Sequence, residues 1–152
     1  MNEENTRKLM ERFSFILRAN PLYPRDIIMP MSFDCGDGWF NLLWRLCEDI
    51  EKTLAKPENG RLKEHFVVDQ VKEKFAGLRF YVSLLDGGID TLIDRAEYDS
   101  YRTCEECGEP GKPRDGGWYR TLCDKHAEAR GQMKVLEMKW SPEYLERIGE
   151  KE

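Results

Sequence analysis

Four residues in the C-terminal third of the chain have the types and the spacing of a tetrahedral metal site. Two residues separate Cys104 from Cys107, and two separate Cys123 from His126. Thiolates and imidazoles at this spacing bind Zn²⁺ from tight turns, and Gly108 tolerates the unusual backbone angles that such a turn requires. Three thiolates and one imidazole leave no coordination position open. The sequence therefore predicts one structural zinc ion.

The segment between the two ligand pairs has the composition of a zinc ribbon. Prolines and glycines are frequent at 110–117, and the run Trp-Tyr-Arg-Thr-Leu follows at 118–122. This pattern predicts a loop and then a short strand that returns the chain to the metal. Redox sensing through the same thiolates stays open as an alternative. Nucleic-acid binding is disfavoured, because acidic residues around the ligands equal the basic ones in number.

A second candidate chemistry is nucleophilic. Cys35 lies just before a predicted helix, whose dipole would lower the pKa of a thiol, and His65 could act as its base. A Cys/His hydrolase would combine these two groups, but no third group that would orient the histidine is evident. In the simpler interpretation, Cys35 is a small buried residue and Gly36 and Gly38 form a turn. His65 then lies on a strand surface or in the core.

Carboxylates offer a third candidate chemistry. Asp34 and Asp37, with Glu48 or Asp49 on the following helix, could hold Mg²⁺ for phosphoryl transfer. Most carboxylates of an acidic chain are solvated, and Asp37 has a simpler use as the N-cap of that helix. We also treat Asp34 and Asp37 as candidate contacts to a partner.

A predicted β-hairpin interleaves basic and aromatic side chains over residues 72–81. We take Lys74, Arg79 and Tyr81 as candidate contacts to a protein partner. The same pattern would suit stacking on single-stranded nucleic acid, or an ordinary amphipathic hairpin with one solvated face. Alternation predicts that Leu78, Phe80 and Val82 lie on one face of the hairpin and Arg79, Tyr81 and Ser83 on the other.

These residues must be positioned by a small α+β fold. Apolar periodicity and terminating residues predict helices at 5–19, 38–56 and 89–101, and a hairpin at 65–84. We expect a small antiparallel sheet with packed helices over 1–102, a zinc-ribbon element at 103–131 and an extension at 132–152. Smaller features are also predicted: a long ordered loop at 20–38 with a short strand at 27–29, a helix at 125–132, and a final short helix that begins at Ser141.

The composition of the whole chain restricts the class of protein. Apolar residues make up 40% of 152 residues, enough for one core of ordinary size, and the formal net charge is −5 with no net basic segment. No run of residues has the length of a signal peptide or a membrane span. Five cysteines, an odd number, fit metal binding better than a set of disulfides. We therefore expect a protein of the cytoplasm.

Three stretches together resemble a known group of proteins. They are CGDGWF at 35–40, VKEKFAGLRFYV at 71–82, and TCEECGEPGKPR at 103–114 with GWYRTLCDKHA at 117–127. This combination resembles small uncharacterised zinc-ribbon proteins of bacteria, phages and prophages, over about residues 33–127. The resemblance implies a cytoplasmic, mobile-element-associated zinc protein with the same four ligands. The group brings no activity that can be transferred to this chain.

Together these features predict a non-enzymatic, zinc-stabilised protein-interaction module. The resemblance extends this to a phage- or prophage-encoded inhibitor or modulator of a host complex, such as a defence system in a bacterial host cell. A zinc-ribbon protein that binds nucleic acid is the first alternative. A hydrolase that depends on Cys35 or on carboxylates is the second.

Overall fold

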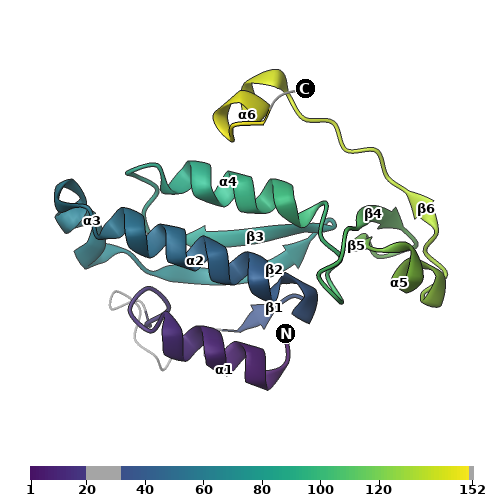
Figure 1. Cartoon of the computed structure of the whole chain (residues 1–152), viewed down its shortest axis with the longest axis horizontal. Coiled ribbons are helices and arrows are strands. Elements are labelled where there is room, and N and C mark those ends of the chain that lie inside the picture. Colours follow the sequence, from purple (N-terminus) through teal and green to yellow (C-terminus); the bar gives the residue numbers. More distant parts are fainter. Residues whose placement is uncertain (20–31, 151–152) are drawn as a thin grey trace.

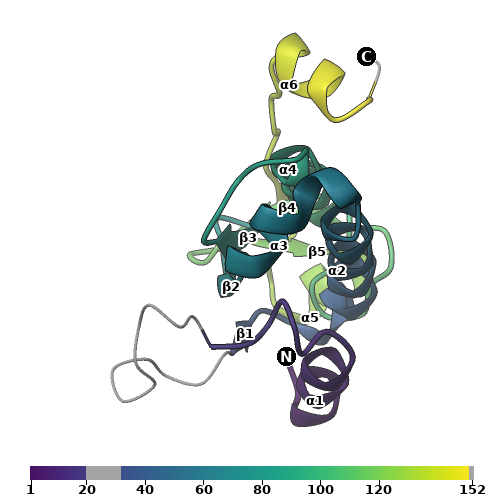
Figure 2. The same cartoon turned by 90° about the vertical axis from the view of Figure 1, so that its left-hand side faces the viewer.

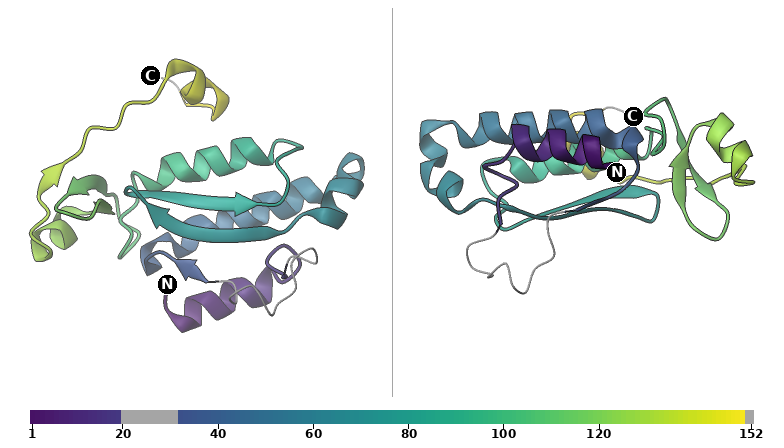
Figure 3. Two further views of the ribbon diagram at one scale, coloured as in Figure 1. Left: turned by 180° about the vertical axis from the view of Figure 1, so that it is seen from behind. Right: turned by 90° about the horizontal axis from the view of Figure 1, so that it is seen from below.

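A three-stranded sheet with helices on one face forms the larger part of the structure. The structure is a computed structural model and describes residues 1–19 and 32–150. The strands are β1 (Phe33–Asp34), β2 (Val68–Lys74) and β3 (Gly77–Val82), in the order β1-β2-β3. Helices α1 (Glu3–Arg12), α2 (Phe40–Leu54) and α4 (Ile89–Ser100) lie over one face of this sheet (Figures 1 and 3). This arrangement confirms the predicted α+β class.

The sheet is mixed rather than purely antiparallel. β2 and β3 form the predicted hairpin, with Val71 opposite Phe80, whereas β1 pairs with β2 in parallel and places Phe33 opposite Val71. These three side chains are buried on the face that the helices cover. Along β3, Leu78 and Phe80 are buried and Tyr81 is exposed, as the period of two predicts.

The largest core side chain comes from the segment before α2. Trp39 is fully buried at the end of a short 3-10 helix (Asp37–Trp39), and α2 continues from it with its apolar face against the sheet. Leu43 and Ile50 lie two turns apart on that face and are also fully buried. Figure 1 shows α2 and α4 side by side over the strands.

Two predicted boundaries are wrong. The helix predicted at 5–19 ends at Arg12, because the chain beyond it returns to the sheet, where the Val68 amide donates to the Ile16 carbonyl at 2.8 Å. The hairpin predicted to begin at His65 begins at Val68. Residues Gly60–His65 instead form helix α3, after a 3-10 turn at Pro57–Asn59.

The two residues at the tip of the hairpin have left-handed backbone angles. Phe75 has a φ of 53° and Ala76 a φ of 68°, the conformation of a two-residue type I′ turn, which usually selects asparagine or glycine. Two contacts hold Ala76 in place: its amide donates to Glu73 Oε1 at 2.8 Å, and its carbonyl accepts from Thr121 Oγ1 at 2.8 Å. The tip of the hairpin is thereby joined to the segment predicted to bind zinc.

A second three-stranded sheet lies beyond α4. Its strands are β4 (Lys112–Asp115), β5 (Arg120–Leu122) and β6 (Lys134–Val135), in the order β5-β4-β6, and α5 (Asp124–Ala129) follows β5. The sequence predicted only one strand here. The central strand was missed because it contains Pro113, whose carbonyl nevertheless accepts from the Leu136 amide at 2.9 Å.

The C-terminal segment crosses back to the core and ends in helix α6 (Pro142–Arg147). Ser141 is the N-cap of α6, as predicted, and its hydroxyl oxygen accepts from the Tyr144 amide at 3.2 Å. Trp140 packs edge-on against Tyr98 and Tyr101 and stacks on Tyr144 at 4.9 Å between ring centroids. Figure 1 shows the long connection without regular structure that leads from β6 to α6, and Figure 2 shows α6 on the side of α4.

The structure tests only in part the loop predicted at 20–38 and the predicted absence of a membrane span. Residues 20–31, which include the strand predicted at 27–29 and most of the loop predicted at 20–38, lie outside the described residues. Within the described ranges, no helix is long and apolar enough to cross a bilayer.

Candidate metal centre

Two turns bring the four predicted ligands together. The first follows α4: the Cys104 amide donates to the Glu109 carbonyl at 2.7 Å and the Gly108 amide to the Cys104 carbonyl at 2.9 Å. Gly108 has a φ of 80°, which explains the glycine at this position. The second is the start of α5, where Cys123 is the N-cap residue and His126 lies in the first turn.

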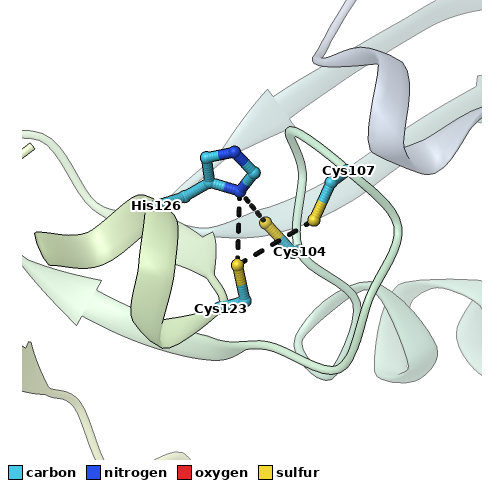
Figure 4. A group of neighbouring side chains, drawn as sticks. All are labelled: Cys104, Cys107, Cys123 and His126. Carbon is cyan, nitrogen blue, oxygen red and sulfur yellow. Dashed lines mark hydrogen bonds between the residues drawn. The ribbon is translucent and has the colours of Figure 1, made fainter. Parts of the chain in front are cut away.

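Three separations between the ligand atoms lie near those of tetrahedral coordination by one metal ion. Cys104 Sγ lies 3.4 Å from His126 Nδ1, Cys123 Sγ lies 3.2 Å from the same nitrogen, and Cys107 Sγ lies 3.9 Å from Cys123 Sγ. Ideal tetrahedral geometry with the usual Zn–S and Zn–N bond lengths requires about 3.8 Å between sulfurs and about 3.6 Å between sulfur and nitrogen. The four side chains point toward one common position (Figure 4) and are close enough to hold one metal ion.

A carboxylate supports the histidine from behind. His126 turns Nδ1 toward the thiols, and its Nε2 lies 3.8 Å from Glu106 Oε2. Arg130 binds the other oxygen of Glu106 and so fixes the carboxylate. Ligating histidines commonly have a carboxylate near the second ring nitrogen, which favours one tautomer, although at 3.8 Å this contact is longer than a hydrogen bond.

The surroundings shift the pKa values of two of the thiols in opposite directions. The backbone N–H of His126, at the start of α5, donates to Cys123 and lowers the pKa of that thiol. Loss of solvation, together with the neighbouring thiols, raises the pKa of Cys107 to about 11. A bound cation reverses this second effect, because metal ligation requires the thiolate and releases the proton.

The first metal-binding turn is seated on the segment Cys35 to Trp39. The Gly38 amide donates to the Glu105 carbonyl at 2.8 Å, the Gly36 amide to Glu105 Oε1 at 2.9 Å, and Trp39 Nε1 to the Thr103 carbonyl at 2.8 Å. Three hydrogen bonds thus join the metal-binding turn to the start of the 3-10 helix and to the buried indole of Trp39.

Close approach explains both glycines of this segment. A Cβ on Gly38 would lie 2.1 Å from the Cys104 carbonyl oxygen and 2.7 Å from the Cys107 amide nitrogen, and a Cβ on Gly36 would lie 2.2 Å from the Glu105 carbonyl oxygen. The sequence suggested that these glycines form a turn. In the structure, the absence of a side chain at both positions lets the backbone of the first metal-binding turn lie in direct contact with this segment. A single sequence does not reveal that contact.

Asp37 does not cap the helix that follows it, contrary to expectation. It is the first residue of the 3-10 helix, and its Oδ1 accepts from the Asn2 amide at 2.8 Å and from Asn5 Nδ2 at 3.1 Å. These hydrogen bonds lower the pKa of Asp37. Asp37 therefore fastens the start of α1 to the segment that receives the metal-binding turn. Asp34 is exposed at the end of β1.

The structure does not bring the proposed Cys/His pair together. Asp34 pairs with Lys72 of β2, so the next residue, Cys35, lies near Lys72 along the length of that strand. His65 lies beyond the other end of β2, three residues before its start. Strand geometry puts roughly 20 Å between the two levels. Burial also raises the pKa of Cys35 to about 12, the opposite of the predicted activation.

The proposed magnesium ligands are likewise separate. Among the described residues, the cysteine and histidine cluster is the one group of three or more metal-binding side chains within reach of a common ion. Glu48 accepts from Trp44 Nε1 at 3.2 Å and Asp49 pairs with Lys52 at 2.8 Å.

The candidate partner contacts on the hairpin differ in their surroundings. Arg79 is turned toward α4, where it pairs with Glu97 at 2.5 Å and donates to Tyr101 Oη at 3.3 Å. It holds β3 against α4 and does not point into solvent. Lys74 and Tyr81 are exposed, as the partner-binding hypothesis requires.

Sequence reasoning missed a group of exposed aromatic side chains beside the metal-binding element. Trp118 is 64% exposed, Phe75 62% and Tyr119 42%. The rings of Phe75 and Tyr119 lie 6.5 Å apart, and Trp118 Nε1 donates to Glu73 Oε2 at 3.0 Å. The signals were present in the sequence, as an aromatic at the hairpin turn and a Trp-Tyr pair before Cys123. Their convergence depends on how the second sheet docks.

Comparison of the chain with models of protein families, with curated proteins and with solved structures gives no match.

Proposed function

We propose that this protein is a non-enzymatic interaction module in which one structural Zn²⁺ holds a protein-binding surface in place. Three thiolates and an imidazole, a donor set typical of structural zinc, support the identity of the metal. All four ligands come from the chain, so the ion has no position left for a substrate. Its contribution is to the folding free energy.

The observation that carries the interaction role is the exposed aromatic group of Phe75, Trp118 and Tyr119, called here the aromatic patch. Exposed aromatics are costly to leave in water, and aromatic residues dominate the energetic centres of protein interfaces. Two elements supply the patch, the β2–β3 turn and the loop before β5. Their relative position depends on the contact between Thr121 and Ala76 and on the metal-bound turns.

The resemblance to bacterial, phage and prophage zinc-ribbon proteins supports a more specific proposal. In this proposal the module is encoded by a mobile element and inhibits or modulates a host complex, such as a defence system, in the bacterial cytoplasm. Five free cysteines and no disulfide fit a reducing compartment.

Affinity capture from a lysate of the host bacterium tests the interaction role. The bait proteins are the parent, Trp118→Ala, and a control, Leu85→Ala, which truncates an equally exposed side chain outside the aromatic patch. We expect one partner that the parent and the control retain and that Trp118→Ala loses, while all three melt at similar temperatures. Equal retention by Trp118→Ala, or no specific partner for the parent, would contradict the proposal.

A further inference from the structure

The five cysteines of the chain differ in their access to solvent. Cys35, Cys47 and Cys104 are buried, Cys123 is partly exposed and Cys107 is exposed. Oxidation of a cysteine depends on the access of the oxidant to its sulfur and on its thiolate character. Cys107 is therefore the sulfur that an oxidant dissolved in water reaches first.

Cys107 has a second thiol beside it on the other metal-binding turn. Its Sγ lies 3.9 Å from Cys123 Sγ, and the two side chains approach from different turns (Figure 4). Both are ligands of the candidate metal centre, and a ligating cysteine is a thiolate, the form that reacts with peroxides. An exposed thiolate with a second thiolate within reach is the arrangement of a reversible oxidation site.

Cys104 is a poorer partner for an oxidised Cys107. Its side chain is fully buried in the small apolar cluster of the metal-binding element. Its backbone is held on both sides, because its amide donates to the Glu109 carbonyl at 2.7 Å and its carbonyl accepts from the Gly108 amide at 2.9 Å. Cys123 is more accessible and lies at the first turn of α5. The pair that can join with least repacking is therefore Cys107 and Cys123.

We propose that Cys107 and Cys123 are a hydroperoxide-sensitive site whose oxidation to a disulfide releases the metal. The Cys107 thiolate attacks the hydroperoxide, so that an S–O bond forms, the O–O bond breaks and an alkoxide leaves. The Cys123 thiolate then attacks the sulfur of the resulting sulfenic acid, so that the S–S bond forms and hydroxide leaves. The two thiolates lose two electrons and the hydroperoxide gains them. Two protons from water convert the leaving groups to one alcohol and one water.

The disulfide removes two of the four metal ligands. Cys104 and His126 alone do not complete a tetrahedral site, so the zinc ion is released. The new bond also draws the two sulfurs from 3.9 Å to about 2.0 Å, which pulls the two metal-binding turns toward each other. This inference rests on the zinc ion of the proposed function but not on the partner protein, and it adds a way in which the metal is lost and restored.

Zinc release together with disulfide mapping tests the site. The zinc-loaded protein is treated with hydrogen peroxide, the released zinc is measured with a chromogenic chelator, and disulfides are located by mass spectrometry of peptides. We expect one zinc ion released for each Cys107–Cys123 disulfide, and full rebinding after a dithiol reductant is added. The control is Cys35→Ala/Cys47→Ala, which removes the two thiols outside the metal centre and should release zinc at the rate of the parent.

Cys107→His separates the reactivity of this position from its role as a ligand. An imidazole replaces the exposed thiolate, so the site keeps four ligands but loses the sulfur that is oxidised first. After its zinc content has been confirmed by metal analysis, this variant should lose zinc to peroxide on the order of tenfold more slowly than the parent. If it binds no zinc, the disulfide map of the parent decides alone.

Three outcomes would overturn the proposal. They are retention of zinc by the parent under conditions that oxidise a free cysteine peptide, a Cys104–Cys107 disulfide as the main product, and release of zinc from Cys107→His at the rate of the parent. Metal analysis of the untreated parent distinguishes this inference from the proposed function. A parent without zinc contradicts both, whereas a parent that keeps its zinc in peroxide contradicts only the oxidation site.

Discussion

Gly38→Ala should detach the metal-binding turn from the core. The new Cβ would lie 2.1 Å from the Cys104 carbonyl oxygen and 2.5 Å from the Gly108 amide nitrogen, both of which are backbone atoms. Carbon and oxygen need about 3.3 Å, so one segment must move by roughly 1 Å. Such a shift breaks the hydrogen bonds of Gly38 and Trp39 to this turn and weakens that of Gly36.

The magnitude follows from those three hydrogen bonds. At about 1 kcal/mol for each of the two that break, and less for the one that weakens, Gly38→Ala should lower the free energy of unfolding by about 2–3 kcal/mol. In a chain of this size that corresponds to a drop of about 4–12 °C in the melting temperature. Circular dichroism melts of the zinc-loaded protein measure it, with urea unfolding as a second estimate.

Gly60→Ala is the matched control. Gly60 begins α3 with helical angles, φ −55° and ψ −45°, and a Cβ there would meet nothing within 4 Å. This variant should gain about 0.5–1 kcal/mol, because alanine reduces the freedom of the unfolded chain. If Gly38→Ala melts within about 1 °C of the parent, the close approach between Gly38 and the metal-binding turn is not as described.

Four further predictions concern the metal, its surroundings and the two ends of the fold. Cys104→Ser should bind well under one zinc per chain by metal analysis and should melt at a lower temperature than the parent. Acidification should release zinc from the parent, because protons compete with the metal for the ligands. Glu106→Gln should weaken zinc binding by about 10- to 100-fold in a chelator competition, whereas Glu109→Gln should not. Cys35, with a pKa raised to about 12, should resist alkylation in the folded protein at pH 8 and react after unfolding. Trp140→Ala should cost about 3 kcal/mol or less and speed proteolysis near α6.

The pH dependence associated with Cys35 has a definite sign. Its pKa is higher in the folded protein than in the unfolded chain, so the folded state keeps the proton longer. The stability from this group is complete below the unfolded pKa of about 8.5 and declines as pH rises toward the folded value of about 12. Comparison with Cys35→Ala between those limits measures the slope, and a parent that gains stability there relative to the variant would contradict the argument.

The predictable parts of the fold were those with a strong local signal. The apolar face of α2, the alternation in β3 and the Ser-Pro start of α6 each rest on a few neighbouring residues, and each was located correctly. The four ligands were recognisable for the same reason, because two turns of fixed spacing require no knowledge of the rest of the chain. Local periodicity and turn chemistry are sufficient in such cases.

The features that escaped prediction depend on contacts between distant segments. Asp37 looked like a cap for its own helix, but it binds Asn2, and Gly38 looked like a turn residue, but it admits the backbone of Cys104. Arg79 looked like a surface cation until α4 placed Glu97 beside it. Nothing within a few residues of these positions distinguishes the two roles.

The crossing of the C-terminal segment back to α4 has a consequence for chain entropy. Residues 101–141 lie between α4 and α6, and the packing of Trp140 closes this loop. A metal bound by both Cys104 and His126 shortens the flexible part of this loop by about half. Halving the length of a loop lowers the entropic cost of closing it by about 0.6 kcal/mol. Loss of the ion should therefore lower the ratio of docked to undocked α6 about threefold, although α6 contains none of the four ligands. Hydrogen exchange in α6 would then report on metal occupancy at a distance.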